Sequence, residues 1–289
     1  PNNCNGLRSF SSSMANALGP VGHRINVKDA DLNVTGASFW FQGMYVIETE
    51  GEGARGDNIA SRKFTAAWSG ASWNLNETGA QTFGSVLQRW SGASVNSATN
   101  GTDDGRLYVA VKVTGPVNGF YHYEFAAQNR DNARGVSALR IPVCTGARVQ
   151  NLGFGDIDDD AGNNWSASVG SGENEWSTAV NPLEWNTIFN FWFDSDAAPA
   201  AADLLLDQAT AGPGLPTVAV ASSAPLGLFN VFLGAGCAND PPATLFASGS
   251  PARATLGHAS FSIRSSGNSP VQPNGLKYSL VSGSHTLAG

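Results

Sequence analysis

Charged residues are scarce in this chain. They make up 13% of its 289 residues, about half of the ~25% found in an average protein. Four of them are lysines, and no Lys or Arg lies between Arg148 and Arg253, although that stretch carries twelve acidic residues. Nucleic-acid binding requires a basic surface that replaces the counterions of the phosphates. The charge pattern therefore argues against nucleic acid as a partner.

The chain also lacks a long apolar run. No stretch approaches the ~20 consecutive apolar residues that a membrane-spanning helix needs, so we expect no membrane span. The sequence begins at Pro1 rather than at Met, which indicates processing or a start partway along a longer chain. We expect a mature protein that is secreted, either extracellular or at the cell surface.

Cysteine is rare as well. The three cysteines, Cys4, Cys144 and Cys237, are too far apart for a Cys-x-x-Cys redox or zinc motif. They are compatible with one disulfide plus one remaining thiol, with a bond to a residue before Pro1, or with three buried thiols. The spacing leaves these alternatives open.

Strand patterns dominate what is present. Residues 39–47 are aromatic and β-branched, and residues 106–113 alternate, with Leu107, Val109, Val111 and Val113 on one face. A turn at 115–119 leads into 120–125, and this pair is the clearest hairpin. Further strands are expected at about 21–27, 61–68, 84–90, 136–143, 147–154, 164–170, 186–194 and 202–208. Residues 197–208 fit a helix and a strand equally well. The pattern predicts an all-β fold with an antiparallel β-sandwich.

A change in composition predicts a second domain. Residues 211–216 are rich in Gly and Pro and resemble a linker. Beyond them acidic residues almost vanish, and short strands are interrupted by Pro and Gly. We therefore predict a large β-sandwich domain at 1–212, followed by a smaller β-sandwich-like, Ig-like domain at 213–289.

One acidic loop is a candidate metal site. Asp156, Asp158 and Asp160 alternate and are followed by Gly162 and Asn163. Calcium prefers several oxygen ligands, and a glycine permits the tight loop that presents them. The spacing matches a calcium loop in part, because Ala161 precedes the glycine and no Glu stands at the final ligand position. The alternative is a solvated acidic turn, since Asp, Asn and Gly are common turn residues.

Tryptophan supplies candidate ligand-binding residues. The chain has eight Trp residues, and an exposed indole can stack on a sugar ring. Three of them stand in polar, turn-rich segments and are expected to be the most exposed: Trp73, Trp165 and Trp176. The competing interpretation is that they pack in a sandwich core.

Catalytic motifs are not evident, and no catalytic residue is predicted. The chain has no Gly-x-Ser-x-Gly elbow and no His-Glu-x-x-His zinc motif, and its four histidines are scattered. His122 alternates with tyrosines in a strand and is interpreted as a hydrogen-bonded structural residue. A pair of glycosidase carboxylates among the glutamates stays open, because only their spatial distance would reveal it.

Three blocks carry a family resemblance: residues 119–129, residues 149–158 and, most specifically, residues 183–199. Through them the chain, from Gly19 to about Leu206, resembles a family of uncharacterised secreted β-rich proteins of planctomycete-type bacteria. The resemblance implies an extracellular location but no reaction. A cysteine-bearing segment often precedes this region in such proteins, so the resemblance also implies that Pro1 is an internal cut.

These features together favour a non-enzymatic structural or interaction protein of the cell exterior, such as a subunit of a surface layer, matrix or filament. Its expected partners are copies of itself or other cell-surface proteins. The alternatives are a protein similar to a carbohydrate-binding module, with glycans as partners and calcium as its ion, and an enzyme that degrades an extracellular polymer.

Overall fold

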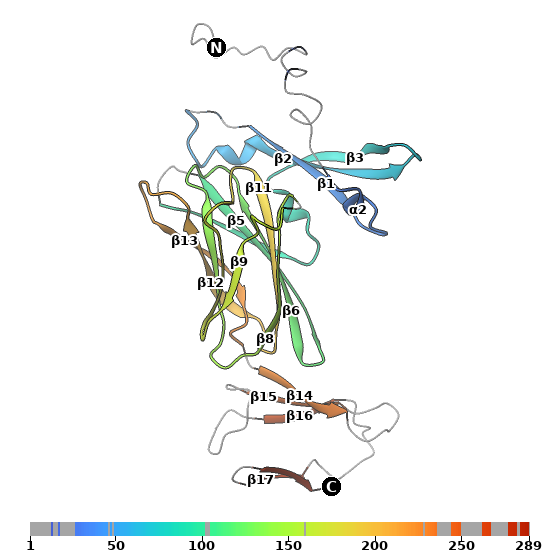
Figure 1. Ribbon diagram of the computed structural model, residues 1–289, viewed down its shortest axis with the longest axis vertical. Coiled ribbons are helices and arrows are strands. Elements are labelled where there is room, and N and C mark those ends of the chain that lie inside the picture. Colours follow the sequence, from blue (N-terminus) through green and yellow to red (C-terminus); the bar gives the residue numbers. More distant parts are fainter. Residues whose placement is uncertain are drawn as a thin grey trace. The chain divides into compact units, whose positions relative to one another are not determined.

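The computed structural model places most of the chain (Figure 1). The residues that it describes are 13, 17, 27–45, 47, 49–101, 105–158, 160–227, 229–235, 244–249, 262–266, 277–281 and 284–288. The chain divides into two compact units, one formed by residues 1–43 and 60–82 and the other by residues 44–59 and 83–289. Both are built almost entirely from antiparallel strands, as the sequence predicts.

The first unit is small and contains the short helix α2 (Asp29–Leu32) and a three-stranded sheet. The strand order is β1-β2-β3, with β1 at Phe39–Met44, β2 at Ile59–Trp68 and β3 at Trp73–Phe83. This sheet is not part of the sandwich. The prediction of one sandwich domain over 1–212 is therefore wrong at its N-terminal side, because the strand pattern alone does not reveal which strands share a sheet.

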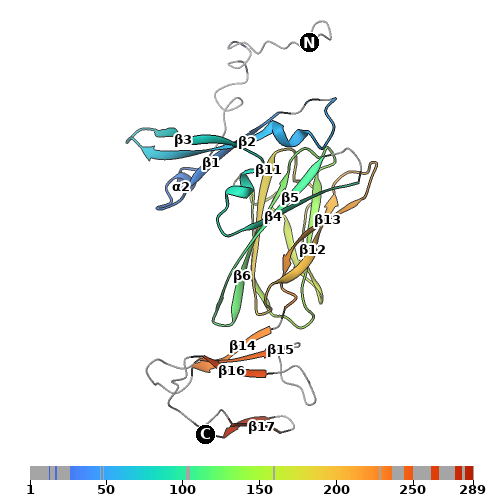
Figure 2. The same ribbon diagram turned by 180° about the vertical axis from the view of Figure 1, so that it is seen from behind.

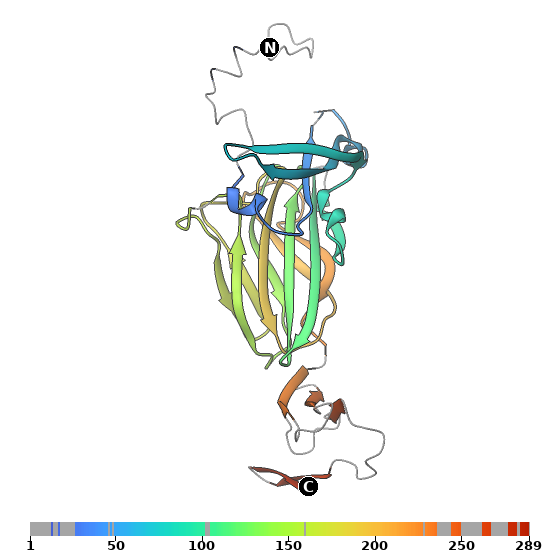
Figure 3. The ribbon, with the colours of Figure 1, turned by 90° about the vertical axis from the view of Figure 1, so that its right-hand side faces the viewer.

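Two five-stranded sheets form the sandwich of the second unit. One has the order β4-β5-β6-β11-β8, with bounds Ser94–Thr99, Arg106–Val117, Phe120–Asn129, Thr187–Ser195 and Val149–Gly155. The other has the order β13-β12-β7-β10-β9, with bounds Thr217–Ala224, Ala200–Gln208, Val136–Pro142, Glu173–Ser177 and Ser166–Val169. Figure 3 shows that their strands run in nearly the same direction.

The sandwich core follows from the alternation of the strands. Leu107, Val109 and Val111 are at most 3% exposed, and Val113 packs beside them, as their spacing predicts. The other sheet contributes Leu139, Ile141, Leu204, Leu206, Val218 and Val220 to the same cluster. Because successive side chains of a strand point to opposite faces, one face of each sheet is buried against the other.

The predicted hairpin of residues 106–125 is confirmed. Strands β5 and β6 pair antiparallel, and Val117 lies opposite Phe120. The two residues between them, Asn118 and Gly119, have φ angles of 52° and 84°. Positive φ at both central positions is the geometry of a two-residue hairpin turn, and Asn-Gly is its preferred sequence.

One predicted strand, at 84–90, is wrong. Val86–Arg89 forms the 3-10 helix η2. The hydroxyl of Ser85 accepts the backbone N–H of Leu87 at 3.1 Å, which stabilises a turn in place of an extended backbone. Leu87 then packs on Ala110 and Ala126, on the outer face of the sheet.

The predicted domain boundary at 212/213 is also wrong. Strand β13 pairs with β12 from Ala200↔Ala224 to Asp207↔Thr217, so the sandwich continues beyond the Gly/Pro segment (Figure 2). The guanidinium of Arg134 donates to the carbonyl oxygens of Thr210, Pro213 and Leu215 at 2.7, 3.0 and 3.3 Å. The segment is thus an anchored hairpin connection, which uses the same turn residues as a linker.

Among the described residues, five further strands follow β13. A three-stranded sheet has the order β14-β15-β16, with bounds Phe229–Ala235, Thr244–Gly249 and Ser262–Ser266. Strands β17 (Lys277–Val281) and β18 (Ser284–Ala288) pair with each other. That they form a small Ig-like domain stays a prediction. Cys4 and Cys237 lie outside the described residues, and Cys144 is a half-buried free thiol.

A charged cluster lies at one end of the sandwich, where the 3-10 helix η1 (Arg55–Asn58) and the residues before it meet β5 and β6. Arg130, with a side chain 2% exposed, donates to Asp131 at 2.9 Å and to Glu52 at 2.9 Å. Arg106 also donates to Glu52, at 2.7 Å. These hydrogen bonds, that of Arg106 above all, hold the pKa of Glu52 below its ordinary value.

Candidate functional site

A hollow in the first unit lies beside the β2–β3 hairpin. Trp68 is the last residue of β2 and Trp73 is the first residue of β3. Ser69 and Ser72 close the turn, because the backbone N–H of Ser69 donates to the carbonyl of Ser72 at 2.9 Å. The turn sets the two indoles side by side, with ring centroids 5.6 Å apart and ring planes inclined by 59°.

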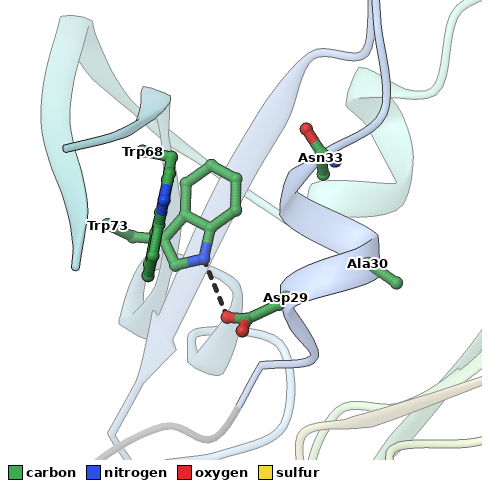
Figure 4. A pocket seen from close by; sticks show the side chains of 5 residues that line it. All are labelled: Asp29, Ala30, Asn33, Trp68 and Trp73. Carbon is green, nitrogen blue, oxygen red and sulfur yellow. Dashed lines mark hydrogen bonds between the residues drawn. The ribbon is translucent and has the colours of Figure 1, made fainter. Parts of the chain in front are cut away.

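Helix α2 supplies the opposite wall of this cleft. The Nε1–H of Trp73 donates to Asp29 Oδ1 at 2.8 Å, and Figure 4 shows the Trp73 ring between Trp68 and the helix. A cavity of about 270 Å³ is lined by Asp29, Ala30, Asn33, Trp68 and Trp73. The hydrogen bond fixes the orientation of the Trp73 ring in the wall of the cleft.

A second cavity, of about 420 Å³, adjoins the first and shares Asn33, Trp68 and Trp73 with it. Its lining includes Phe39 and Phe64, whose rings stack with centroids 5.6 Å apart. Polar side chains line it too, among them Thr35, Lys63 and Thr65. We name the two cavities together the tryptophan cleft. It combines aromatic walls with a few polar groups, as small-molecule sites commonly do.

Of the three tryptophans that the sequence indicated, the structure brings Trp73 alone to this cleft. Trp68, which the sequence reasoning did not select, is 54% exposed and forms the outer wall. Trp68 lies at the end of a strand, five residues before Trp73. Residues that flank a hairpin turn face each other, so this spacing could have predicted from the sequence that the two indoles are neighbours.

The expectation that Trp165 and Trp176 are exposed is wrong. They are 4% and 0% exposed and belong to the sandwich core. Trp165 stacks on Phe154 with centroids 5.9 Å apart, and its Nε1–H donates to the carbonyl of Asn181 at 2.7 Å. Their polar sequence neighbours point outward along short strands or turns, while the indoles point inward. Neither residue is available to bind a ligand from solvent.

The acidic loop after β8 is organised by its own backbone. The carboxylate of Asp156 accepts the N–H of Asp158 at 3.1 Å, and that of Asp158 accepts the N–H of Asp160 at 2.7 Å. Asn163 donates its side-chain amide to Asp158 at 3.2 Å. Within the described residues, no three His, Cys, Asp or Glu side chains form a group that could hold a metal ion.

Calcium binding by this loop stays a prediction, and a direct titration tests it. If Asp156, Asp158, Asp160 and Asn163 gather around calcium, the ion should raise the melting temperature of the protein, because it binds the folded state alone. Differential scanning calorimetry with calcium and with a chelator measures the shift. The Asp158→Ala variant should lose the response. Equal melting temperatures in both buffers would contradict the prediction.

Several described carboxylates of the sandwich pair with a basic or amide side chain, and one of them pairs with His122. His122 Nδ1 lies 2.7 Å from Asp194 Oδ1, and Asn151 donates to the other oxygen of Asp194 at 2.6 Å. Glu173 lies 3.7 Å from Arg140, and Glu52 belongs to the charged cluster. The interpretation of His122 as a hydrogen-bonded residue is confirmed, although its side chain is 41% exposed.

Comparison of the chain with protein-family models, with curated proteins and with solved structures finds no match. In the part of the chain that the structure describes, no helix is long and apolar enough to cross a membrane.

Proposed function

We propose that this chain is a non-enzymatic structural or interaction protein of the cell exterior, a subunit that associates with copies of itself in a surface layer, matrix or filament. The observation that carries the proposal is strand β3 (Trp73–Phe83). Within the described residues β3 pairs with β2 and with no strand on its other side. Its outer edge therefore presents backbone N–H and C=O groups to another chain.

Strand β3 lacks the usual protection of an edge. Protein edges are commonly blunted by short length, proline or charged residues, lysine above all. Strand β3 is 11 residues long, has no proline and contains a single charged residue, Glu77. It exposes Leu75 and Phe83, at 54% and 62%. An edge of this kind is suited to β-strand addition by a second copy.

One edge strand of the sandwich makes a useful contrast. Strand β9 (Ser166–Val169) forms one edge of the sandwich and has four residues, all exposed. A short edge offers few hydrogen bonds to a second strand. Association through β3 is therefore favoured over association through β9.

Association should depend on β3 and resist salt. Because the contacts are backbone hydrogen bonds and apolar side chains, we expect oligomers in sedimentation velocity at both low and high ionic strength. The double variant Leu75→Lys/Gln81→Lys should be monomeric, since two lysines repel a second copy of the same edge. The matched control, Ala167→Lys/Val169→Lys on β9, changes equally exposed positions and should associate like the unmodified chain. If the unmodified chain sediments as a monomer at high concentration and low salt, the proposal is contradicted.

Two arguments support the exterior location. The scarcity of lysine and the high content of Gly are typical of proteins held in fixed extracellular arrays. The resemblance of residues 119–129, 149–158 and 183–199 to secreted planctomycete-type proteins points the same way. Two of these blocks hold strands β6 and β11, which pair along nine residues, so the resemblance falls on the centre of the sandwich.

A further inference from the structure

We propose that the tryptophan cleft binds a neutral saccharide chain. This inference concerns a different feature from the β3 edge and does not depend on self-association. The side chain of Trp68 is 54% exposed although it is large and apolar. A ring that stays open to water beside a cavity is ready to stack on a ligand, because covering it removes apolar surface from water.

The walls of the cleft match the two sides of a sugar ring. A pyranose has a face of C–H groups, which packs on an indole, and a rim of hydroxyl groups, which need hydrogen-bond partners. Trp68 and Trp73 supply the aromatic surfaces at 59° to each other. Asp29 and Asn33, from the α2 side, supply a carboxylate and an amide in the same cavity.

These polar groups retain capacity for a ligand. Asp29 uses Oδ1 to accept the Trp73 indole N–H, and among the described residues no donor contacts its Oδ2. The side-chain amide of Asn33 likewise makes no hydrogen bond to another described residue. A carboxylate accepts hydrogen bonds from hydroxyl groups, and an amide both donates and accepts. Together they can pair with neighbouring hydroxyls of one sugar.

The combined volume of the two adjoining cavities favours a chain of sugars over a single small cation. Two aromatic residues and a carboxylate can also hold a quaternary ammonium group by cation–π attraction. Such a small group would occupy only part of the 270 Å³ cavity and would leave the adjoining 420 Å³ cavity, with Thr35 and Thr65 in its lining, without a role. A linear saccharide is long enough to extend from the first cavity into the second, where its hydroxyl groups can pair with Thr35 and Thr65.

The charge around the cleft favours a neutral ligand. Asp29 stands in the first cavity and Asp31 lies on the same short helix, so an acidic sugar would be repelled at that end. The ammonium of Lys63, in the second cavity, lies 5.7 Å from the centroid of the Trp40 ring, which already balances its charge in part. A neutral polymer of hexoses avoids this repulsion by the two carboxylates.

Isothermal titration calorimetry with three neutral hexasaccharides, cellohexaose, chitohexaose and mannohexaose, tests the proposal. The Leu75→Lys/Gln81→Lys variant serves as the parent chain, so that self-association does not interfere with the measurement. At least one of the three sugars should bind. The substitution Trp68→Ala should weaken that binding by about 10-fold or more, as removal of a central aromatic contact does. Trp68→Phe, which keeps an aromatic face, should retain most of it.

Two controls make the result decisive. Trp185 is 46% exposed and lies outside the cleft, so Trp185→Ala should leave the affinity unchanged, and tetramethylammonium should not bind. Within the cleft, Asp29→Asn should weaken sugar binding. Absence of binding by all three sugars, an equal loss in Trp185→Ala, or binding of tetramethylammonium without sugar would each overturn the proposal. None of these outcomes bears on the oligomeric state, which sedimentation of the unmodified chain decides.

Discussion

Replacement of Trp176 by alanine is expected to destabilise the sandwich by about 3–5 kcal/mol. Trp176 is fully buried, and its ring lies 5.7 Å from that of Phe191 and 5.9 Å from that of Phe193. These two residues belong to β11 of one sheet, while Trp176 belongs to β10 of the other. Alanine would leave a cavity between the sheets, and neighbours in a close-packed core refill such a space poorly.

Urea unfolding followed by circular dichroism measures this loss, because the signal does not depend on the removed indole. The control Trp185→Ala changes a residue that is 46% exposed and should stay within about 0.5 kcal/mol of the parent. The Nε1–H of Trp176 has no hydrogen-bond partner among the described residues. Trp176→Phe leaves no donor unpaired and creates a smaller cavity, so it should cost less than Trp176→Ala. An alanine variant as stable as the parent would place Trp176 outside the core.

Replacement of Arg130 by methionine is expected to cost about 3–5 kcal/mol, because it removes one partner of a buried ion pair. The side chains of Arg130 and Asp131 are 2% and 1% exposed, and that of Glu52 is 16% exposed. Methionine keeps much of the apolar stem but donates no hydrogen bond. The buried carboxylate of Asp131 would then lose its closest guanidinium and retain Arg55 at 3.5 Å.

Thermal and urea unfolding measure the effect, with an exposed ion pair as control. Arg62 pairs with Glu77 on the surface, where the two side chains are 37% and 53% exposed, so Arg62→Met should cost less than about 1 kcal/mol. Equal losses in the two variants would mean that the charged cluster is solvated like a surface pair.

The strands themselves could be predicted from local sequence. Alternation at 106–113 and 120–125 and the Asn-Gly turn between them identify β5 and β6, since a β-strand repeats every two residues. Residues 197–208 could not be assigned locally, because alanine and leucine favour helix while the segment lacks a helical period. They form β12 because β7 and β13 pair with it on its two sides, and such pairing outweighs intrinsic propensity.

Which strands share a sheet was decided by tertiary structure. The Gly/Pro segment at 211–216 has the composition of a linker and of a turn alike, and the contacts of Arg134 with its carbonyls distinguish the two. No local pattern links Arg134 to a segment more than 70 residues away. The same limit applies to Arg130 and Glu52, whose pairing spans 78 residues.

By itself, the sequence determined the fold class, the position of most strands and the low charge of the surface, because these depend on residue type and on a period of two. Only the tertiary structure decided which tryptophans are buried. Trp165 and Trp176 share a polar sequence context with Trp73, yet they face Phe154 and Phe191 across the core, while Trp73 joins Trp68 at the open cleft. The reason is physical: exposure depends on what packs against a side chain, and those partners come from distant parts of the chain.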